Sequence, residues 1–208
     1  MLSDAAANLM LDALDESQTS GAKYWSLHTA YSTSGANEVS GGSYTRQAAT
    51  WAAASSRSKA STGSPAASFS VPASTTVAWV GRWTASTSGT FLGMAPAGGG
   101  NRRQVTANAS GVTANTLDSP AHGLTAGTAV VFWASTGAAL PTGLVEGTIY
   151  YVIATGLTTD VFSVSATSGG SAVDITAVGD GEVQTIVPET FTGAGTYNLT
   201  SDTLSVSV

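Results

Sequence analysis

Two segments of alternating residues, joined by a glycine-rich loop, constrain the fold of this chain more than any other feature. The first segment runs from Trp25 to Ala30 and the second from Tyr44 to Trp51. A period of two, with aromatic residues near the segment ends, predicts a half-buried antiparallel pair of strands. The connecting residues 35–42 (GANEVSGG) are too polar and glycine-rich for a strand, so we expect a surface loop there.

Residues 3–15 have the pattern of a short amphipathic helix. Ser3 can cap its N-terminus, and Asp4 complements the positive end of the helix dipole. Apolar residues recur at three-four spacing and form a stripe, namely Ala6, Leu9, Met10 and Ala13. We expect this stripe to pack on the sheet; the alternative is that Leu9 and Met10 contact a partner subunit.

Further strands are expected up to residue 94. Residues 52–68 contain mainly Ala, Ser, Thr, Gly and Pro, which predicts a long loop with room for a short edge strand. The patterns at 69–72 and 76–83 predict strands. Turn-forming residues at 86–89 predict a hairpin that joins 76–83 to a strand at 90–94.

The sequence changes character after the glycine-rich segment 96–100. Short apolar segments then alternate with Gly, Pro and Asp turns about every ten residues, a pattern typical of a small all-β domain. The earlier pattern returns near residue 191, and the last six residues alternate like a strand that completes an earlier sheet. We therefore predict a discontinuous domain of residues 1–103 plus 189–208, interrupted by an inserted domain of residues 104–188, because surface loops tolerate insertions.

The expected fold is all-β: a jelly-roll-like β-sandwich with a short N-terminal helix and an inserted small all-β domain. The helix, the segments WSLHTA and GANEVSGGSYTR and the following TW-AAS resemble a family of phage tail-fibre or minor tail proteins. The resemblance covers about residues 4–96 and resumes at 191–208. Residues 112–187, with HGL, YYV and FSVS at recurring spacing, resemble a β module inserted in many phage tail and fibre proteins.

This resemblance implies a non-enzymatic structural protein of the virion, located on the tail or tail fibre. A capsid decoration protein is the alternative within the same class. The implied partners are other virion proteins and copies of the same chain, as a homotrimer or a lattice subunit. Small uncharged side chains on strand faces, such as Ala48 and Thr50 or Ser205 and Ser207, favour such contacts, because edges of free monomers usually carry charges.

The composition argues against several other functions. Seven Lys and Arg against 13 Asp and Glu give a net charge of −6, and only 10% of residues are charged, compared with about a quarter in typical proteins. Nucleic-acid binding is not expected, because phosphate contacts need clustered basic residues. We also expect no membrane insertion and no signal peptide, and therefore synthesis in the host cytoplasm followed by assembly into the virion.

No constellation of residues predicts catalysis, a metal site or a cofactor. The chain has no cysteine and only two histidines, which lie far apart in the sequence. His28 has Glu38 and Ser40 as its nearest candidate catalytic partners, and we expect a structural role for it. His122 lies in a Pro-Ala-His-Gly turn, and the acidic residues at 160, 174, 180 and 182 lack the spacing of a calcium-binding loop.

One further hypothesis comes from the aromatic residues of the inserted domain. Trp133, Tyr150 and Tyr151 are predicted to lie near exposed loops, where aromatic rings could contact a sugar. The inserted domain would then be an adhesin that binds a glycan of the host surface.

Overall fold

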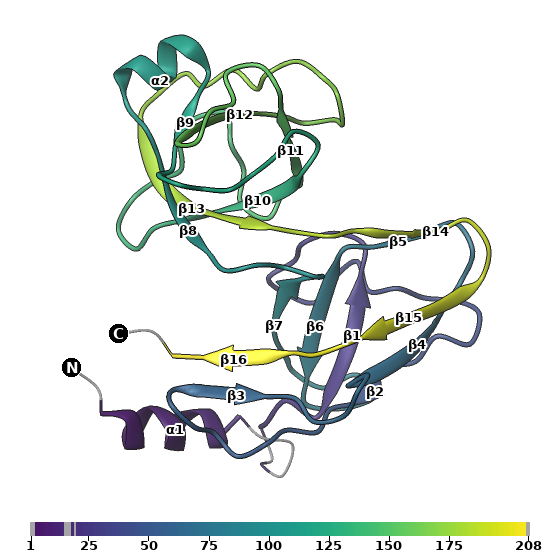
Figure 1. Cartoon of the computed structure of the whole chain (residues 1–208). Helices are drawn as coiled ribbons and strands as arrows, with labels where there is room; N and C mark the ends of the chain where they lie inside the picture. Colours follow the sequence, from purple (N-terminus) through teal and green to yellow (C-terminus); the bar gives the residue numbers. More distant parts are fainter. Residues whose placement is uncertain (1–2, 15–17, 19, 207–208) are drawn as a thin grey trace. The chain divides into compact units, whose positions relative to one another are not determined.

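The computed structural model describes residues 3–14, 18 and 20–206, and it confirms the all-β class with a short N-terminal helix (Figure 1). Its contacts divide the chain into two compact units. Unit 1 comprises Met1–Ala95 and Glu189–Val208, and unit 2 comprises Pro96–Pro188. Within the described residues, no helix has both the length and the apolar character needed to cross a bilayer.

Unit 1 contains a four-stranded sheet with the strand order β2-β1-β6-β7. The helix and the strands of this sheet are α1 (Asp4–Asp12), β1 (Tyr24–His28), β2 (Gln47–Ala48), β6 (Trp79–Trp83) and β7 (Phe91–Pro96). The predicted antiparallel pairing of the first two alternating segments is confirmed, since Tyr24 lies opposite Ala48. The second segment is much shorter than predicted, because hydrogen bonds from a side chain and a loop take its place beside β1, as described below.

A long antiparallel ribbon forms the other part of unit 1. Its outgoing strands are β3 (Ser58–Ala60), β4 (Ala67–Val71) and β5 (Thr75–Val77), and its returning strands are β14 (Glu189–Phe191), β15 (Gly195–Leu199) and β16 (Thr203–Ser205). β14 pairs with β5, β15 with β4 and β16 with β3, so the C-terminal segment retraces residues 58–77 in reverse (Figure 1). The prediction that the last strand completes an earlier sheet is confirmed, although residues 207–208 lie outside the described part.

Asp202 attaches this ribbon to the four-stranded sheet. Its carboxylate accepts a hydrogen bond of 2.9 Å from the Trp25 indole N–H and forms an ion pair with Arg82. Trp25 and Arg82 lie opposite each other on β1 and β6, so one carboxylate links both strands. The Asp202 side chain is only 8% exposed, and removal of a partner would leave a buried, uncompensated charge, a change that usually destabilises a protein strongly.

β1 is buried on both faces, whereas its alternation predicted a half-buried strand. Trp25, Ser26, Leu27 and His28 are all buried. The ribbon covers the face that carries Trp25, and a loop covers the face that carries His28. Alternation therefore marks the two faces correctly but does not show that only one is buried, since small polar residues are buried when they are hydrogen-bonded.

Unit 2 is a closed antiparallel barrel with the strand order β10-β11-β12-β9-β8-β13. Its elements are β8 (Arg103–Ala107), α2 (Ala109–Ala114), β9 (Leu117–Asp118), β10 (Ala129–Ala134), β11 (Tyr150–Ile153), β12 (Val161–Ser165) and β13 (Gly179–Thr185). Pairing of β13 with β10 closes the barrel around a core centred on Phe132 and Phe162. The short helix α2 was not predicted; Asn108 caps it by accepting a 2.9 Å hydrogen bond from Gly111 N.

The segments that lead into and out of the barrel are hydrogen-bonded to each other. Val187 N donates to Ala97 O over 2.8 Å, and Gly100 N donates to the Thr185 hydroxyl over 2.9 Å. The two ends of the barrel segment are therefore adjacent, which is the geometry of a domain inserted at one point of a host domain. The predicted inserted domain began at residue 104, eight residues after the start of unit 2.

We predict that each unit folds without the other. Replacement of residues 98–186 by a short Gly-Ser linker should leave unit 1 folded, because its strand pairs and the Asp202 contacts lie within residues 3–95 and 189–206. Cooperative thermal unfolding and a dispersed NMR spectrum would show this for the shortened chain, and also for residues 96–188 alone. A molten or insoluble product from either part would contradict the prediction.

Candidate functional site

Residues 29–46, here called the cover loop, lie over one face of β1 and β6 and contain the motif predicted to be a surface loop. Gly35 allows the loop to approach the sheet, since it has a φ of +80° and lies against the rings of Trp83 and Phe91. Asn37 adopts the left-handed conformation with a φ of 61°, which asparagine tolerates well. Val39 is buried, so the loop is part of the packed structure rather than a free surface segment.

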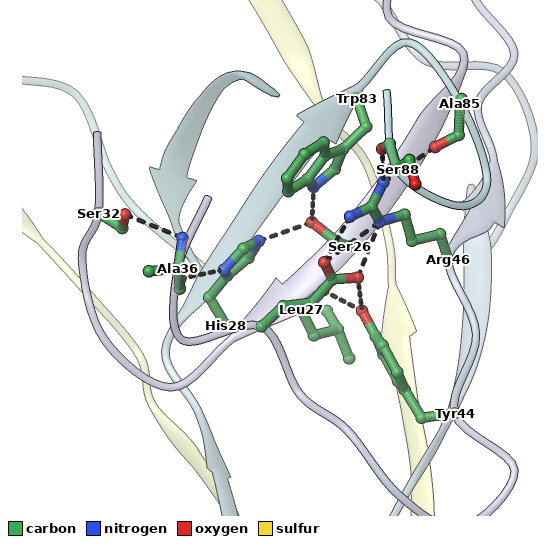
Figure 2. Close-up of polar contacts among 11 residues, drawn as sticks. Ser26, Leu27, His28, Ser32, Ala36, Tyr44, Arg46, Trp83, Ala85 and Ser88 are labelled. Atoms are coloured by element: carbon green, nitrogen blue, oxygen red, sulfur yellow. Dashed lines mark hydrogen bonds and ion pairs between the residues drawn. The ribbon is translucent and has the colours of Figure 1, made fainter. Parts of the chain in front are cut away.

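A chain of hydrogen bonds runs beneath this loop, from the sheet to the loop backbone (Figure 2). The Trp83 indole N–H donates to Ser26 Oγ over 2.9 Å, and Ser26 Oγ lies 2.7 Å from His28 Nε2. His28 Nδ1 lies 2.9 Å from Ala36 O. Because a carbonyl can only accept, His28 Nδ1–H donates to Ala36 O. In the neutral ring, Nε2 accepts the Ser26 hydroxyl proton, whereas in the charged ring Nε2–H would donate to Ser26 Oγ.

Burial favours the neutral form of His28. His28 is fully buried, and burial lowers the pKa of its imidazole from the usual 6.5, because the charged form loses its hydration. Protonation of Nε2 would also place a second donor against Ser26, which would then have to reverse its hydrogen bond. Burial therefore outweighs the hydrogen bond to Ala36 O and the charge of Glu38, which favour the protonated form, and the pKa of His28 stays below its usual value.

The Ser26–His28 pair has the spacing of a nucleophile and its general base, but its surroundings do not fit catalysis. Both side chains are 0% exposed, and the Ser26 oxygen already accepts the Trp83 N–H. Gly81, on the adjacent strand, packs so closely that a Cβ there would lie 2.5 Å from both Ser26 Oγ and His28 Nε2. No substrate atom can reach the hydroxyl in this arrangement, so the pair acts as a structural contact. Neither Glu38 nor Ser40 is hydrogen-bonded to the His28 ring; its partners are Ser26 and Ala36.

The Glu38 carboxylate instead binds Arg46, at the far end of the cover loop. Arg46 Nε lies 2.9 Å from Glu38 Oε1, and Arg46 Nη2 lies 2.7 Å from Oε2. Arg46 Nη1 also donates to the carbonyls of Ala85 and Ser88, and the guanidinium lies 3.5 Å from the Trp83 ring centroid. The flat guanidinium can make all these contacts at once, which the ammonium of a lysine could not. Arg46 therefore links the middle and the end of the loop to the β6–β7 turn.

Tyr44 fills a gap in the hydrogen bonding of β1. β2 covers only the first residues of β1, and residues 37–39 pair with its other end, since Val39 N donates to Leu27 O over 2.9 Å. Between them, Leu27 N donates to the Tyr44 hydroxyl over 2.8 Å (Figure 2). The hydroxyl itself donates to Glu38 Oε1 over 3.3 Å, and burial raises the pKa of Tyr44. A side chain thus replaces the longer second strand that the sequence predicted.

The three aromatic residues predicted as a sugar-binding group do not form an exposed platform. Tyr150 is 4% exposed and packs edge-on against Phe132 in the barrel core. Trp133 is 7% exposed and lies beneath the Arg102 guanidinium, 4.6 Å from the ring centroid. Only Tyr151 is partly exposed. Sugar binding requires open ring faces, so these exposures do not favour the glycan hypothesis, which stays an untested prediction.

The predicted partner-contact residues are exposed. Leu9 is 72% exposed and Met10 is 55% exposed on α1, whereas Ala7 and Leu11 of the same helix are buried. The predicted stripe therefore does not pack on the sheet. His122, the other histidine, accepts a 2.9 Å hydrogen bond from Leu124 N and packs against Phe162, which is consistent with a role in its turn. The described part of the chain contains no group of three or more acidic or histidine residues placed to bind a metal ion.

A family model described as podophage GP4 fiber I protein gp80 matches residues 1–99. This match confirms the predicted resemblance to a phage tail-fibre-type family. The matched segment contains α1, the cover loop and the four-stranded sheet, and ends before the barrel. No curated protein and no solved structure matches the chain. The motif that carries the resemblance, from Gly35 to Arg46, thus consists largely of residues that hold the cover loop on the sheet.

Several charged or polar contacts were not predicted from the sequence. Asp202 and Lys59 are buried ion-pair residues, but each stands among small polar residues that resemble an ordinary loop. Ser26 is hydrogen-bonded in the core, and serine gives no sequence signal of burial. A partial signal existed for Arg46, since an Arg eight residues after a Glu in a charge-poor chain invites a search for a pair.

We predict that Gly81→Ala destabilises unit 1 by about 1–3 kcal/mol, because the added methyl group would overlap two buried polar atoms. Gly193→Ala is the matched control, since nothing lies within 4 Å of a Cβ at that position. Urea unfolding followed by tryptophan fluorescence would measure both changes. Equal stability of the two variants would contradict the described packing of Ser26 and His28.

Stability should also fall with pH in a way that depends on His28. Its lowered pKa means that, as the pH falls below about 6.5, the unfolded state binds a proton that the native state does not. The contribution of the neutral His28 to the free energy of unfolding is complete above pH 6.5. Below that value, the free energy of unfolding falls by up to about 1.4 kcal/mol per pH unit. Thermal unfolding of His28→Gln between pH 8 and pH 5 should show a shallower decline than that of the wild type. His122 is common to both chains, so an identical pH dependence would refute the assignment to His28.

Proposed function

We propose that this chain is a non-enzymatic structural protein of a phage tail fibre and that several copies assemble in the particle. The observation that carries the proposal is the match of residues 1–99 to a podophage fibre family. The roles of the motif residues support it, because Gly35, Glu38, Tyr44 and Arg46 serve packing and hydrogen bonding within the unit. A fibre subunit needs a rigid body, and the cover loop and ribbon supply one.

The charge pattern is consistent with assembly among many identical chains. Only 10% of the residues are charged, and most of the described cationic side chains are engaged in ion pairs within the chain. Weakly charged surfaces of Ser, Thr and Ala reduce the repulsion between acidic copies that lie close together. Closed rotational symmetry, such as that of a trimer, is the usual way in which identical chains occupy a symmetric attachment point.

Antibodies against the purified chain should label the tail of particles of the phage that encodes it. The measurement is immunogold electron microscopy of intact virions, with mass spectrometry of purified particles to give the copy number. Labelling confined to the head would instead favour a capsid decoration protein. Absence of the chain from purified particles would reject a structural role in the virion altogether.

A further inference from the structure

α1 is oriented with a polar side toward the rest of unit 1. Asp4, Asn8 and Asp12 follow one another at intervals of four residues and therefore lie on the same side of the helix. Each of them contacts the segment that leads into β3. Asp4 Oδ1 lies 2.5 Å from Arg57 Nε, Asn8 Oδ1 accepts from Arg57 N over 2.9 Å, and Asp12 Oδ1 accepts from Ala54 N over 2.9 Å.

Lys59 makes this orientation obligatory. Its side chain is fully buried, and its ammonium lies 2.8 Å from both Asp12 Oδ1 and Ala52 O. A buried ammonium must keep its anionic partner, so rotation of the helix about its axis would be strongly unfavourable. Ala7 and Leu11 are the buried apolar residues on the same side. The ion pair therefore directs the opposite side of the helix toward solvent.

The opposite side of α1 is apolar and exposed. It consists of uncharged residues, all exposed except the half-buried Ala6, namely Ala5, Ala6, Leu9, Met10 and Ala13. Leu9 and Met10 are adjacent and 72% and 55% exposed, and Leu14 beside them is 40% exposed. Single exposed leucines are common on protein surfaces, but a continuous apolar helix face usually marks a contact with another molecule.

We propose that this outer face, formed by Ala6, Leu9, Met10 and Ala13, pairs with the same face of a second copy of the chain. The proposal rests on the proposed assembly in several copies and names the surface that mediates it. Small residues one turn before and after the Leu9–Met10 pair would let two such helices approach closely, with each large side chain over an alanine of the other. The spacing of residues 6, 9 and 13 is also that of a short coiled-coil seam.

Charge favours a second copy over a partner of opposite charge. The chain carries a net charge of −6, so contact between two copies adds least repulsion where the contacting surfaces are uncharged, and this face carries no charge. A basic partner would bind acidic groups, but Asp4 and Asp12 on this helix are already paired with Arg57 and Lys59. The face that is left fits an equally neutral, apolar surface, which its own copy provides.

The first test compares masses of the full chain in solution by analytical ultracentrifugation. The wild type should sediment at a multiple of 20.7 kDa at micromolar concentration, and Leu9→Gln/Met10→Gln should sediment as the monomer and still unfold cooperatively. Val145→Gln/Val178→Gln is the matched control, because these valines are 60% and 61% exposed in unit 2, and it should keep the wild-type mass. A monomeric wild type, or an α1 variant that keeps the wild-type mass, would overturn the proposal.

The second test uses the absence of cysteine from the natural sequence. Met10→Cys should form a covalent dimer under mild oxidation, whereas Val178→Cys, with a similarly exposed position in unit 2, should not. An oligomer that keeps its mass but yields no Met10→Cys dimer would show that the copies meet elsewhere. That result would overturn the helix pairing and leave the proposed fibre role intact, since virion labelling tests that role separately.

Discussion

The double-sided burial of β1 is the constraint on which the rest of unit 1 depends. A central strand that is covered on both faces must have every polar side chain on it hydrogen-bonded, because water cannot reach it. On one face, Trp25 meets Asp202 of the ribbon; on the other, Ser26 and His28 meet Trp83 and the cover loop. Each covering layer is therefore attached to β1 by polar contacts as well as by packing. Loss of either layer would leave polar groups of β1 without the hydrogen-bond partners that this layer supplies.

These attachments connect parts of the chain that lie far apart in sequence. Asp202 joins the C-terminal segment to β1 and β6 across more than a hundred residues, and the whole barrel of unit 2 lies between them in the chain. The barrel can occupy that place because its incoming and outgoing segments are hydrogen-bonded side by side, at Ala97 and Val187. Unit 1 is thus completed only by residues synthesised after unit 2. The family match that ends at residue 99 covers the whole four-stranded sheet but not the returning strands of the ribbon.

The same logic of paired charges explains why α1 turns an apolar face outward. In most surface helices the apolar side faces the protein, because burial of apolar surface drives docking. Here Ala7 and Leu11 are buried, but the buried ammonium of Lys59 also requires Asp12 on that side, so Leu9 and Met10 lie on the outer side. Exposure of this apolar face to water costs free energy, and association with another copy would remove the face from water. Fold and proposed assembly thus share one cause, the arrangement of a few buried ions in a chain with few charges.

The sequence by itself determined the all-β class, the N-terminal helix and the hairpin of β6 and β7, because these depend on periodicity and turn residues within short windows. The resemblance to a fibre family was also readable, since it rests on local features: the N-terminal helix, the segment WSLHTA, the motif from Gly35 to Arg46 and the following TW-AAS. Only the tertiary structure decided which faces are buried: it placed Lys59 and Ser26 in the core, Leu9 and Met10 outside, and the Tyr44 hydroxyl where a strand was expected. The physical reason is that a polar side chain is stable in the core only when its partners are present, and those partners come from distant parts of the chain.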